Sequence, residues 1–257
     1  MKVLHIVSGD LNLGAAKGAL ELHKGLLKMN VDSILLNNGS FTVNEKKILN
    51  LNSSAFSKML IFFLKRIDHY IIKLLFKNSK SYFSTGFFGI NFTNLEAYKT
   101  ADIIHFHWIN QGMVDLNIIS KINKPIIWTI RDMWPFTGGC HYSLDCKKYI
   151  DFCNNCHILN SNKEKDLSWY VQSYKKKKYS NNITFVAISN WLKNVAESSS
   201  LLNKYNISVI PNNIDLNLFY PELKKYSFSF LKFNKNKKVI LIGAINLNNL
   251  YKGFTKF

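Results

Sequence analysis

All the cysteines of the chain lie in one short segment, with the spacing C-x5-C-x6-C-x2-C: Cys140, Cys146, Cys153 and Cys156. Thiolates in fours are a common ligand set of structural zinc, although only the last pair has the close spacing of a zinc knuckle. The alternatives are reduced cysteines packed in the core and disulfides, and disulfides do not fit the cytoplasmic location that we expect. Because four thiolates leave no open coordination position, no catalytic metal is expected.

Polar side chains follow two apolar segments of strand type. His107 comes at the end of one segment, and Arg131 and Asp132 come directly after the other. The carboxyl ends of parallel strands meet at one edge of a sheet, where α/β proteins bind ligands. We therefore name these three residues as candidate catalytic residues. Arg131 could bind a phosphate or carboxylate, or form a salt bridge that orders the loop, and His105 is expected to be a packed histidine.

The first turn of the chain, residues 8–18, is rich in small residues and includes Gly14 and Ala15. Small residues before a helix let a phosphate approach the backbone N–H groups at the helix N-terminus. A tight turn between a strand and a helix needs glycine for steric reasons as well. The segment matches neither GxGxxG nor a Walker loop, so both interpretations stay open.

Short apolar runs alternate with helical patterns along most of the chain. The runs expected to form strands are residues 3–7, 33–36, 102–106, 126–130, 184–188, 207–210 and 239–243. The helical patterns cover residues 15–27, 116–122, 167–178 and 190–202, the last with Ser189 as N-cap. This alternation predicts an α/β fold, with a Rossmann-like parallel sheet and flanking helices.

Residues 56–77 carry a wide apolar stripe with lysines and an arginine beside it. The stripe is formed by Phe56, Met59, Leu60, Phe63, Leu64, Ile67, Ile71, Leu74 and Leu75. A helix that lies in the plane of a membrane has this pattern. An ordinary amphipathic helix that covers one face of a sheet has it as well.

The composition is strongly basic, with 34 Lys+Arg against 16 Asp+Glu and a net charge of +18. This favours an anionic partner such as a membrane surface or a phosphorylated substrate, or it reflects compositional drift towards lysine. No nucleic-acid-binding motif is present, so nucleic acid is not an expected partner. No signal peptide or membrane-spanning segment is recognisable, and we expect a cytoplasmic protein.

Five segments, in order, resemble one enzyme family. They are residues 14–17 (GAAK), 101–110 (ADIIHFHWIN), 128–142 (WTIRDMWPFTGGCHY), 187–192 (AISNWL) and 209–215 (VIPNNID). Together they resemble the retaining glycosyltransferase family 4 (glycosyl transferases group 1), in its branch for colanic acid and other surface polysaccharides. Residues 131–156 are the part most specific to that branch.

The resemblance implies a GT-B architecture of two facing Rossmann-like domains. Residues 1–220, with a Cys-rich loop at 132–159, would be the acceptor domain. Residues 221–257 would be a linker and the first strand of an incomplete donor domain. There, Lys252 before Gly253 would contact the donor diphosphate in place of a metal ion. The family's later donor-site segment would lie beyond residue 257, so the resemblance implies a truncated or split chain with a separate C-terminal half.

The chain also departs from the family, with Arg131 where relatives often have histidine and Ala244 where many have arginine. The activity implied is transfer of a hexose-type sugar from a nucleotide diphosphate sugar to a lipid-linked or oligosaccharide acceptor, with retention of configuration. The enzyme would be peripheral on the inner face of the plasma membrane. Gly14, Ala15, Lys252 and Gly253 would bind the donor. The alternative is a non-catalytic Rossmann-like fragment that acts as a binding partner or is a remnant.

Overall fold

The computed structural model describes the chain except for residues 40–44, 53, 77–81, 235–236, 242 and 244–257. It divides into two compact units, Met1–Asn212 (unit 1) and Asn213–Phe257 (unit 2). The sequence suggested a boundary after residue 220. The two units are described separately.

Unit 1 is built on a seven-stranded sheet in which every pairing is parallel. The strands are β1 (Lys2–Val7), β2 (Asp32–Asn37), β3 (Ile48–Asn50), β4 (Ile103–Phe106), β5 (Ile126–Ile130), β6 (Ile183–Ala187) and β7 (Ile207–Val209). Their order across the sheet is β3-β2-β1-β4-β5-β6-β7. The predicted α/β, Rossmann-like class is confirmed.

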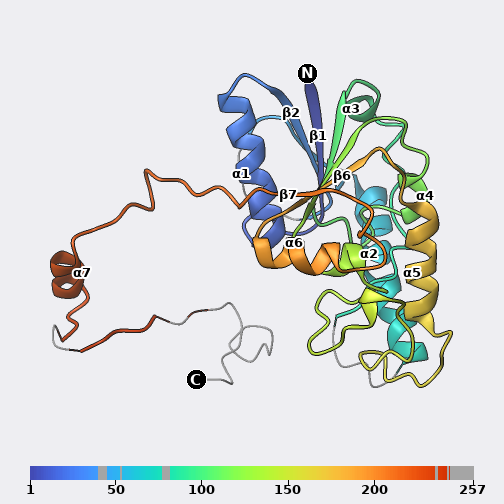
Figure 1. Ribbon diagram of the computed structural model, residues 1–257. Helices are drawn as coiled ribbons and strands as arrows, with labels where there is room; N and C mark the ends of the chain where they lie inside the picture. Colours follow the sequence, from blue (N-terminus) through green and yellow to red (C-terminus); the bar gives the residue numbers. More distant parts are fainter. Residues whose placement is uncertain (40–44, 53, 77–81, 235–236, 242, 244–257) are drawn as a thin grey trace. The chain divides into compact units, whose positions relative to one another are not determined.

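The strand order changes direction between β1 and β4, because β2 and β3 extend the sheet one way and β4 to β7 the other. The helices are α1 (Gly14–Lys28), α2 (Ala55–Leu75), α3 (Glu96–Lys99), α4 (Leu116–Ile119), α5 (Leu167–Lys178) and α6 (Asn190–Glu197). Figure 1 shows α1 on one face of the sheet and α4 and α5 on the other. Such a switch point opens a crevice beyond the carboxyl ends of the two strands.

Side-chain caps begin the helices where the sequence places polar residues. The Ser189 hydroxyl accepts a hydrogen bond from the backbone N–H of Leu192 and begins α6, as predicted. Asp166 begins α5 in the same way, with its carboxylate accepting from the N–H groups of Ser168 and Trp169. The core centres on β5, where the Trp128 side chain is fully buried.

Several elements differ from the expected ones: helix α3 was not predicted, and α4 ends at Ile119 rather than continuing to residue 122. Strand β3 (Ile48–Asn50) was not predicted, because it is a short edge strand in which only two residues are apolar. Helix α6 ends at Glu197 rather than continuing to residue 202. The hydroxyls of Ser198 and Ser199 donate to the carbonyls of Val195 and Ala196 and so compete with the backbone at the helix end.

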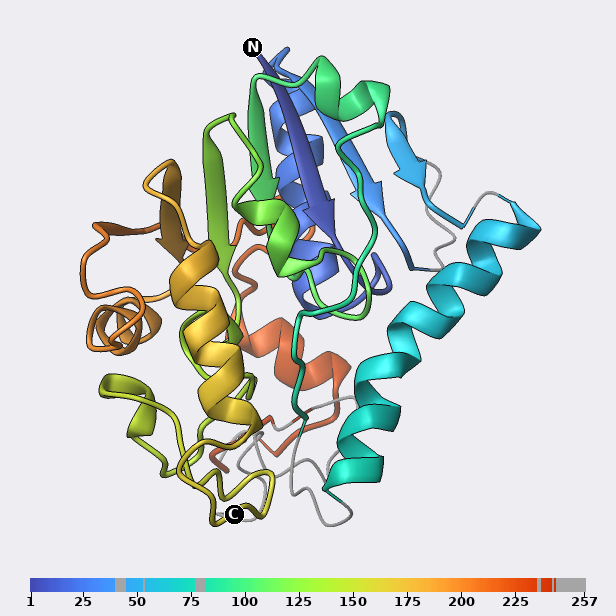
Figure 2. The ribbon, with the colours of Figure 1, turned by 90° about the vertical axis from the view of Figure 1, so that its right-hand side faces the viewer.

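Helix α2 packs against the rest of unit 1 through a face that is not the predicted stripe. Its buried side chains are Ile61 and Ile72, while Phe56, Phe63 and Leu74 are largely exposed. Figure 2 shows α2 along the outer side of unit 1. No helix among the described residues is long and apolar enough to cross a membrane. The interpretation of the stripe as a face that covers the sheet is therefore wrong for most of its residues.

Unit 2 contains the helix α7 (Lys224–Phe230). The strand predicted at residues 239–243 is absent from the described residues 239–241, which have no regular structure. Ile240 and Leu241 are highly exposed there. An isolated strand has no neighbour that would satisfy its backbone groups or cover its side chains. Lys252 and Gly253 lie outside the described residues, so their predicted roles stay predictions.

Candidate functional site

Three histidines gather at the switch point of the sheet. His5 of β1 lies opposite His105 of β4 in the strand register, and His107 directly follows β4. The His105 and His107 rings stack with centroids 4.2 Å apart, and the His5 ring lies 4.9 Å from His105 and 5.3 Å from His107. We call these three residues the histidine cluster. All three are buried.

Hydrogen bonds indicate which nitrogens of His107 and His5 carry protons. Arg131 Nη2 donates to His107 Nδ1 at 3.2 Å, and His107 Nε2 lies 3.0 Å from His5 Nδ1. Because arginine can only donate, a neutral His107 carries its proton on Nε2 and donates it to His5. A neutral His5 then carries its proton on Nε2, which has no hydrogen-bond partner among the described atoms.

Burial keeps the cluster neutral. It lowers the pKa of His5 and of His107 well below 6.5, and neighbouring histidines and Arg131 lower both further. Burial lowers the pKa of His105 to about 3, and Arg131 adds to that effect. His105 Nε2 is satisfied by the Thr129 hydroxyl at 2.8 Å. The expectation that His105 is a packed histidine is confirmed.

Arg131 is a half-buried cation with no carboxylate partner among the described residues. Its Nη1 donates to Asn212 Oδ1 at 2.6 Å and its Nη2 to His107, while its Nε is buried without a partner. The ion pairs found in the described part of the chain do not include it. Burial lowers its pKa to about 10, so it stays protonated at neutral pH. The alternative role of Arg131, a salt bridge that orders the loop, is not observed.

A glycine of α1 makes room for this guanidinium. A Cβ atom added to Gly18 would lie 2.3 Å from Arg131 Nη1, closer than any real contact. Glycine inside a helix costs about 1 kcal/mol relative to alanine, so its presence here needs a reason. The close packing of Arg131 against α1 supplies one.

Alanine at Gly18 is therefore expected to displace the guanidinium from His107 and Asn212. The matched control is Gly25→Ala in the same helix, where nothing lies within 4 Å of an added Cβ. Gly25→Ala should stabilise the chain by up to about 1 kcal/mol. Gly18→Ala should be about 1–2 kcal/mol less stable than that control, because two hydrogen bonds are lost. Urea unfolding of both variants measures the difference, and equal stabilisation would contradict the proposed contact.

Asp132 is held by a second network beside the cluster. Its Oδ2 accepts from Trp108 Nε1 at 2.8 Å and lies 2.6 Å from His141 Nδ1, and its Oδ1 accepts from the Trp134 backbone N–H. The other ring nitrogen of His141, Nε2, lies 3.0 Å from the Ser84 hydroxyl. Asp132 is thus fixed in position, and His141 helps to orient it.

Gly14 begins α1 with a φ of +48°, in the region that favours glycine. The N-cap residue Leu13 offers no side-chain acceptor, so the first N–H groups of the helix have no side-chain cap. Gly14 is exposed and Ala15 half-buried. Their predicted contact with a donor diphosphate stays a prediction.

The cysteines are free thiols in the loop between β5 and α5. Burial raises the pKa of Cys153 to about 12, and Cys156 and Cys146 act in the same direction. The backbone N–H of Gly138 donates to Cys153 Sγ at 3.2 Å. Among the described residues, the group of three ligand atoms within 4.8 Å of one another is the histidine cluster and not a set of sulfurs.

A fully buried lysine lies beside this loop. Lys175 Nζ donates to the carbonyls of Trp134 and Thr137 and lies 3.7 Å from the centre of the Trp134 ring. Burial lowers its pKa to about 7, while Cys140, Cys153 and Asp132 act to raise it. A buried ammonium group favours negative charge nearby, which thiolates would provide.

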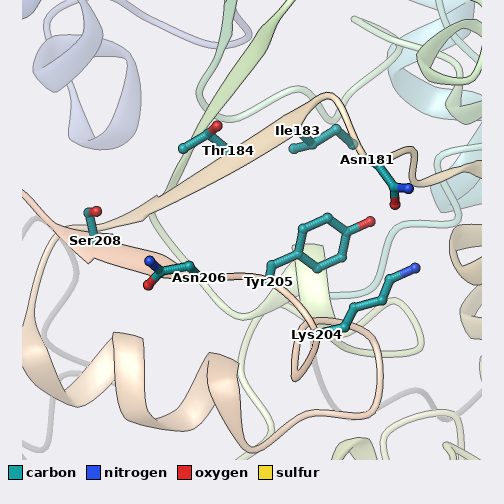
Figure 3. Close-up of a pocket in the computed structure, with 7 residues that line it drawn as sticks. All are labelled: Asn181, Ile183, Thr184, Lys204, Tyr205, Asn206 and Ser208. Carbon is teal, nitrogen blue, oxygen red and sulfur yellow. The ribbon is translucent and has the colours of Figure 1, made fainter.

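A pocket of about 470 Å³ lies elsewhere, at the amino ends of β6 and β7 (Figure 3). It is lined by Asn181, Ile183, Thr184, Lys204, Tyr205, Asn206 and Ser208. The sheet is parallel, so this pocket lies at the edge opposite to His107 and Arg131. It contains none of the predicted site residues.

The structure therefore brings His107 and Arg131 into direct contact, and Asp132 directly follows Arg131 in the chain. Sequence reasoning missed Gly18 and Asn212, which contact Arg131, and His5, which contacts His107. A glycine in the interior of a helical pattern was the available signal for Gly18. Nothing in the local sequence could place Asn212 beside Arg131.

Comparison with known proteins adds one relationship. A stretch of 63 residues, 23% of this chain, is 30% identical to a protein of Escherichia coli (strain K12) named "Putative colanic acid biosynthesis glycosyl transferase WcaC". The matched stretch spans only 16% of the length of that protein. No family model and no solved structure matches the chain. Over this stretch the chain is a distant relative of a glycosyltransferase.

Proposed function

We propose that this chain is the acceptor-side part of a glycosyltransferase. The complete enzyme would transfer a hexose-type sugar from a nucleotide diphosphate sugar to a lipid-linked or oligosaccharide acceptor, with retention of configuration, in the assembly of a surface polysaccharide. It would work on the cytoplasmic side of the plasma membrane. The similarity to a named glycosyltransferase supports the transferase class.

The observation that carries this proposal is the unneutralised guanidinium of Arg131 at the switch point of the parallel sheet. This is the place where α/β folds bind ligands. A fixed cation there would stabilise negative charge on a leaving nucleoside diphosphate without reorganising during the reaction. Asp132, oriented by Trp108 and His141, would accept a hydrogen bond from a sugar hydroxyl.

The proposal is tested by binding of UDP- and GDP-sugars to the purified chain, measured by calorimetry. Sugar transfer is then assayed with the chain alone and with a supplied C-terminal half of a related transferase. We expect measurable binding of one donor, and transfer at least when the second half is present. A folded chain that neither binds nor transfers would instead be the non-catalytic fragment, a binding partner or a remnant.

We also propose a structural zinc ion held by Cys140, Cys146, Cys153 and Cys156. The thiols are free, and the Gly138 N–H and the Lys175 ammonium would both stabilise thiolate charge near them. Zinc would have to draw the sulfurs together, because no three of the described cysteines have sulfurs within 4.8 Å of one another. Such an ion would cross-link and stabilise a loop that has little regular structure.

The chain purified without chelators is expected to contain about one zinc ion per molecule, measured by mass spectrometry of the metal. Cys153→Ser should reduce the zinc content to near zero, and removal of the metal should lower Tm. Ser143→Ala, in the same loop, serves as the control and should keep the metal. A zinc-free chain that takes up none from solution would mean that the cysteines are packing residues.

A further inference from the structure

Helix α2 exposes a continuous apolar surface that no described element covers. The exposed fractions are 70% for Phe56, 61% for Phe63 and 77% for Leu74. Together with Met59, Leu60 and Tyr70, which are also exposed, these residues recur at spacings of three, four and seven. Residues at such spacings share one face of a helix. Five of these six residues belong to the predicted stripe and Tyr70 does not, and from here on the name apolar stripe refers to these six exposed residues.

A basic row runs along one side of the apolar stripe. Arg66 and Lys73 are exposed and lie close to one line on the helix surface, since they are separated by seven residues, and Lys58 is exposed near the start of the helix. The Arg66 guanidinium lies 4.0 Å from the centre of the Phe62 ring, in the same row. The outer side of α2 thus combines apolar side chains with positive charge.

The one acidic residue of α2 is turned towards the protein. Asp68 accepts hydrogen bonds from the backbone N–H and the hydroxyl of Thr85. On the same inner face, Lys65 donates to the carbonyl of Asn38 at 2.7 Å. Ile61 and Ile72 are buried there as well. The helix is therefore anchored in unit 1 with its outer face free of negative charge.

We propose that α2 docks this protein on an anionic lipid surface, lying in the plane of the membrane with the apolar stripe inserted. Apolar side chains at the headgroup boundary and a flanking basic row suit this position. Negative lipids attract Lys and Arg side chains near the surface. The net charge of +18 acts in the same direction, and no described helix can span the membrane instead.

The docking face also lies near the candidate site. Thr85, which binds Asp68 of α2, directly follows Ser84, whose hydroxyl lies 3.0 Å from His141 Nε2. His141 in turn holds Asp132. A bilayer on the outer face of α2 would therefore be separated from the site by this one helix. An acceptor carried on a lipid of that bilayer could then reach the site. The docking itself does not depend on the proposed transferase activity.

The test is sedimentation of the full chain with phosphatidylcholine vesicles and with vesicles that also contain phosphatidylglycerol. We expect binding to the anionic vesicles only, weakening as salt shortens the Debye length below about 10 Å. Phe56→Ser with Phe63→Ser should weaken binding by at least about 10-fold, because two aromatic side chains leave the lipid. Arg66→Gln with Lys73→Gln should weaken it by about 10-fold or more.

Trp191→Ser is the matched control, because Trp191 is 63% exposed on α6 and does not belong to the stripe. It should bind vesicles like the unmodified chain. All the substituted residues are exposed, and circular dichroism checks that each variant is folded. Three results would overturn the proposal: no vesicle binding, equal binding to neutral vesicles, or undiminished binding of the double phenylalanine variant. A dimer that dissociates on the phenylalanine changes would instead assign the stripe to a second copy of the chain. Donor binding, measured separately, reports on the proposed function and not on docking.

Discussion

Replacing Arg131 by methionine is expected to weaken binding of the preferred nucleotide sugar by about 10- to 100-fold. A hydrogen bond to a charged group contributes about 1.5–3 kcal/mol, and each 1.4 kcal/mol is about tenfold in affinity. Methionine keeps much of the length of the side chain and removes the charge. Donor binding by Arg131→Lys should be weaker than that of the unmodified chain and stronger than that of Arg131→Met. Lysine keeps the positive charge but lacks the planar guanidinium that donates to both His107 and Asn212.

The other arginine of the chain, Arg66, provides a control of the same chemistry. Arg66→Met removes one positive charge from the exposed face of α2 and should leave donor binding unchanged. Vesicle binding should show the opposite pattern: Arg66→Met is expected to weaken it and Arg131→Met is not. Calorimetry measures the affinity of both variants for the nucleotide sugar. Undiminished donor binding by Arg131→Met would mean that the guanidinium does not contact the donor.

Acidification below pH 6.5 is expected to destabilise the fold steeply. The histidine cluster is neutral in the folded chain, because burial lowers the pKa of each ring, to about 3 for His105. In the unfolded chain these rings take up protons near pH 6.5. The unfolded state therefore binds more protons below that pH, and each ring reduces the free energy of unfolding by up to about 1.4 kcal/mol per pH unit. Together the three rings reduce the free energy of unfolding by about 4 kcal/mol per pH unit.

This loss begins near pH 6.5 and continues downwards until the folded rings protonate, near pH 3 for His105. Burial also lowers the pKa of His23, so His23 adds to this loss of stability on acidification. Urea unfolding at pH 7, 6 and 5 measures the slope. His105→Gln should reduce this slope by up to about 1.4 kcal/mol per pH unit. An unaltered slope in His105→Gln would show that the ring is not buried in its neutral form.

Much of the fold could be predicted because local patterns and the final structure agree. The segment 126–130 is a strand and 167–178 is a helix with the bounds predicted, since each carries a strong pattern and clear ends. The short edge strand β3 could not be found, because three residues carry too little pattern. The strand expected at 239–243 failed in its described part, because a strand forms only when a neighbour pairs with it.

The candidate site was only partly visible in the sequence. Polar residues after apolar strands pointed to His107, Arg131 and Asp132, because parallel strands end at one edge. The contacts of Arg131 with Asn212 and with the space left by Gly18 join residues that are far apart in the chain. Sequence spacing carries no information about such contacts.

The amino-acid sequence by itself determined the α/β class, the parallel sheet and the edge at which the polar residues collect, because hydrophobic periodicity and strand ends are local properties. Only the tertiary structure decided which face of α2 is outside, because Phe56, Phe63 and Leu74 and the inner Ile61 and Ile72 are equally apolar. It also decided that Arg131 has no carboxylate partner in the part of the chain that the structure describes. Both outcomes depend on which distant segments pack together, and packing depends on the whole chain rather than on any one segment.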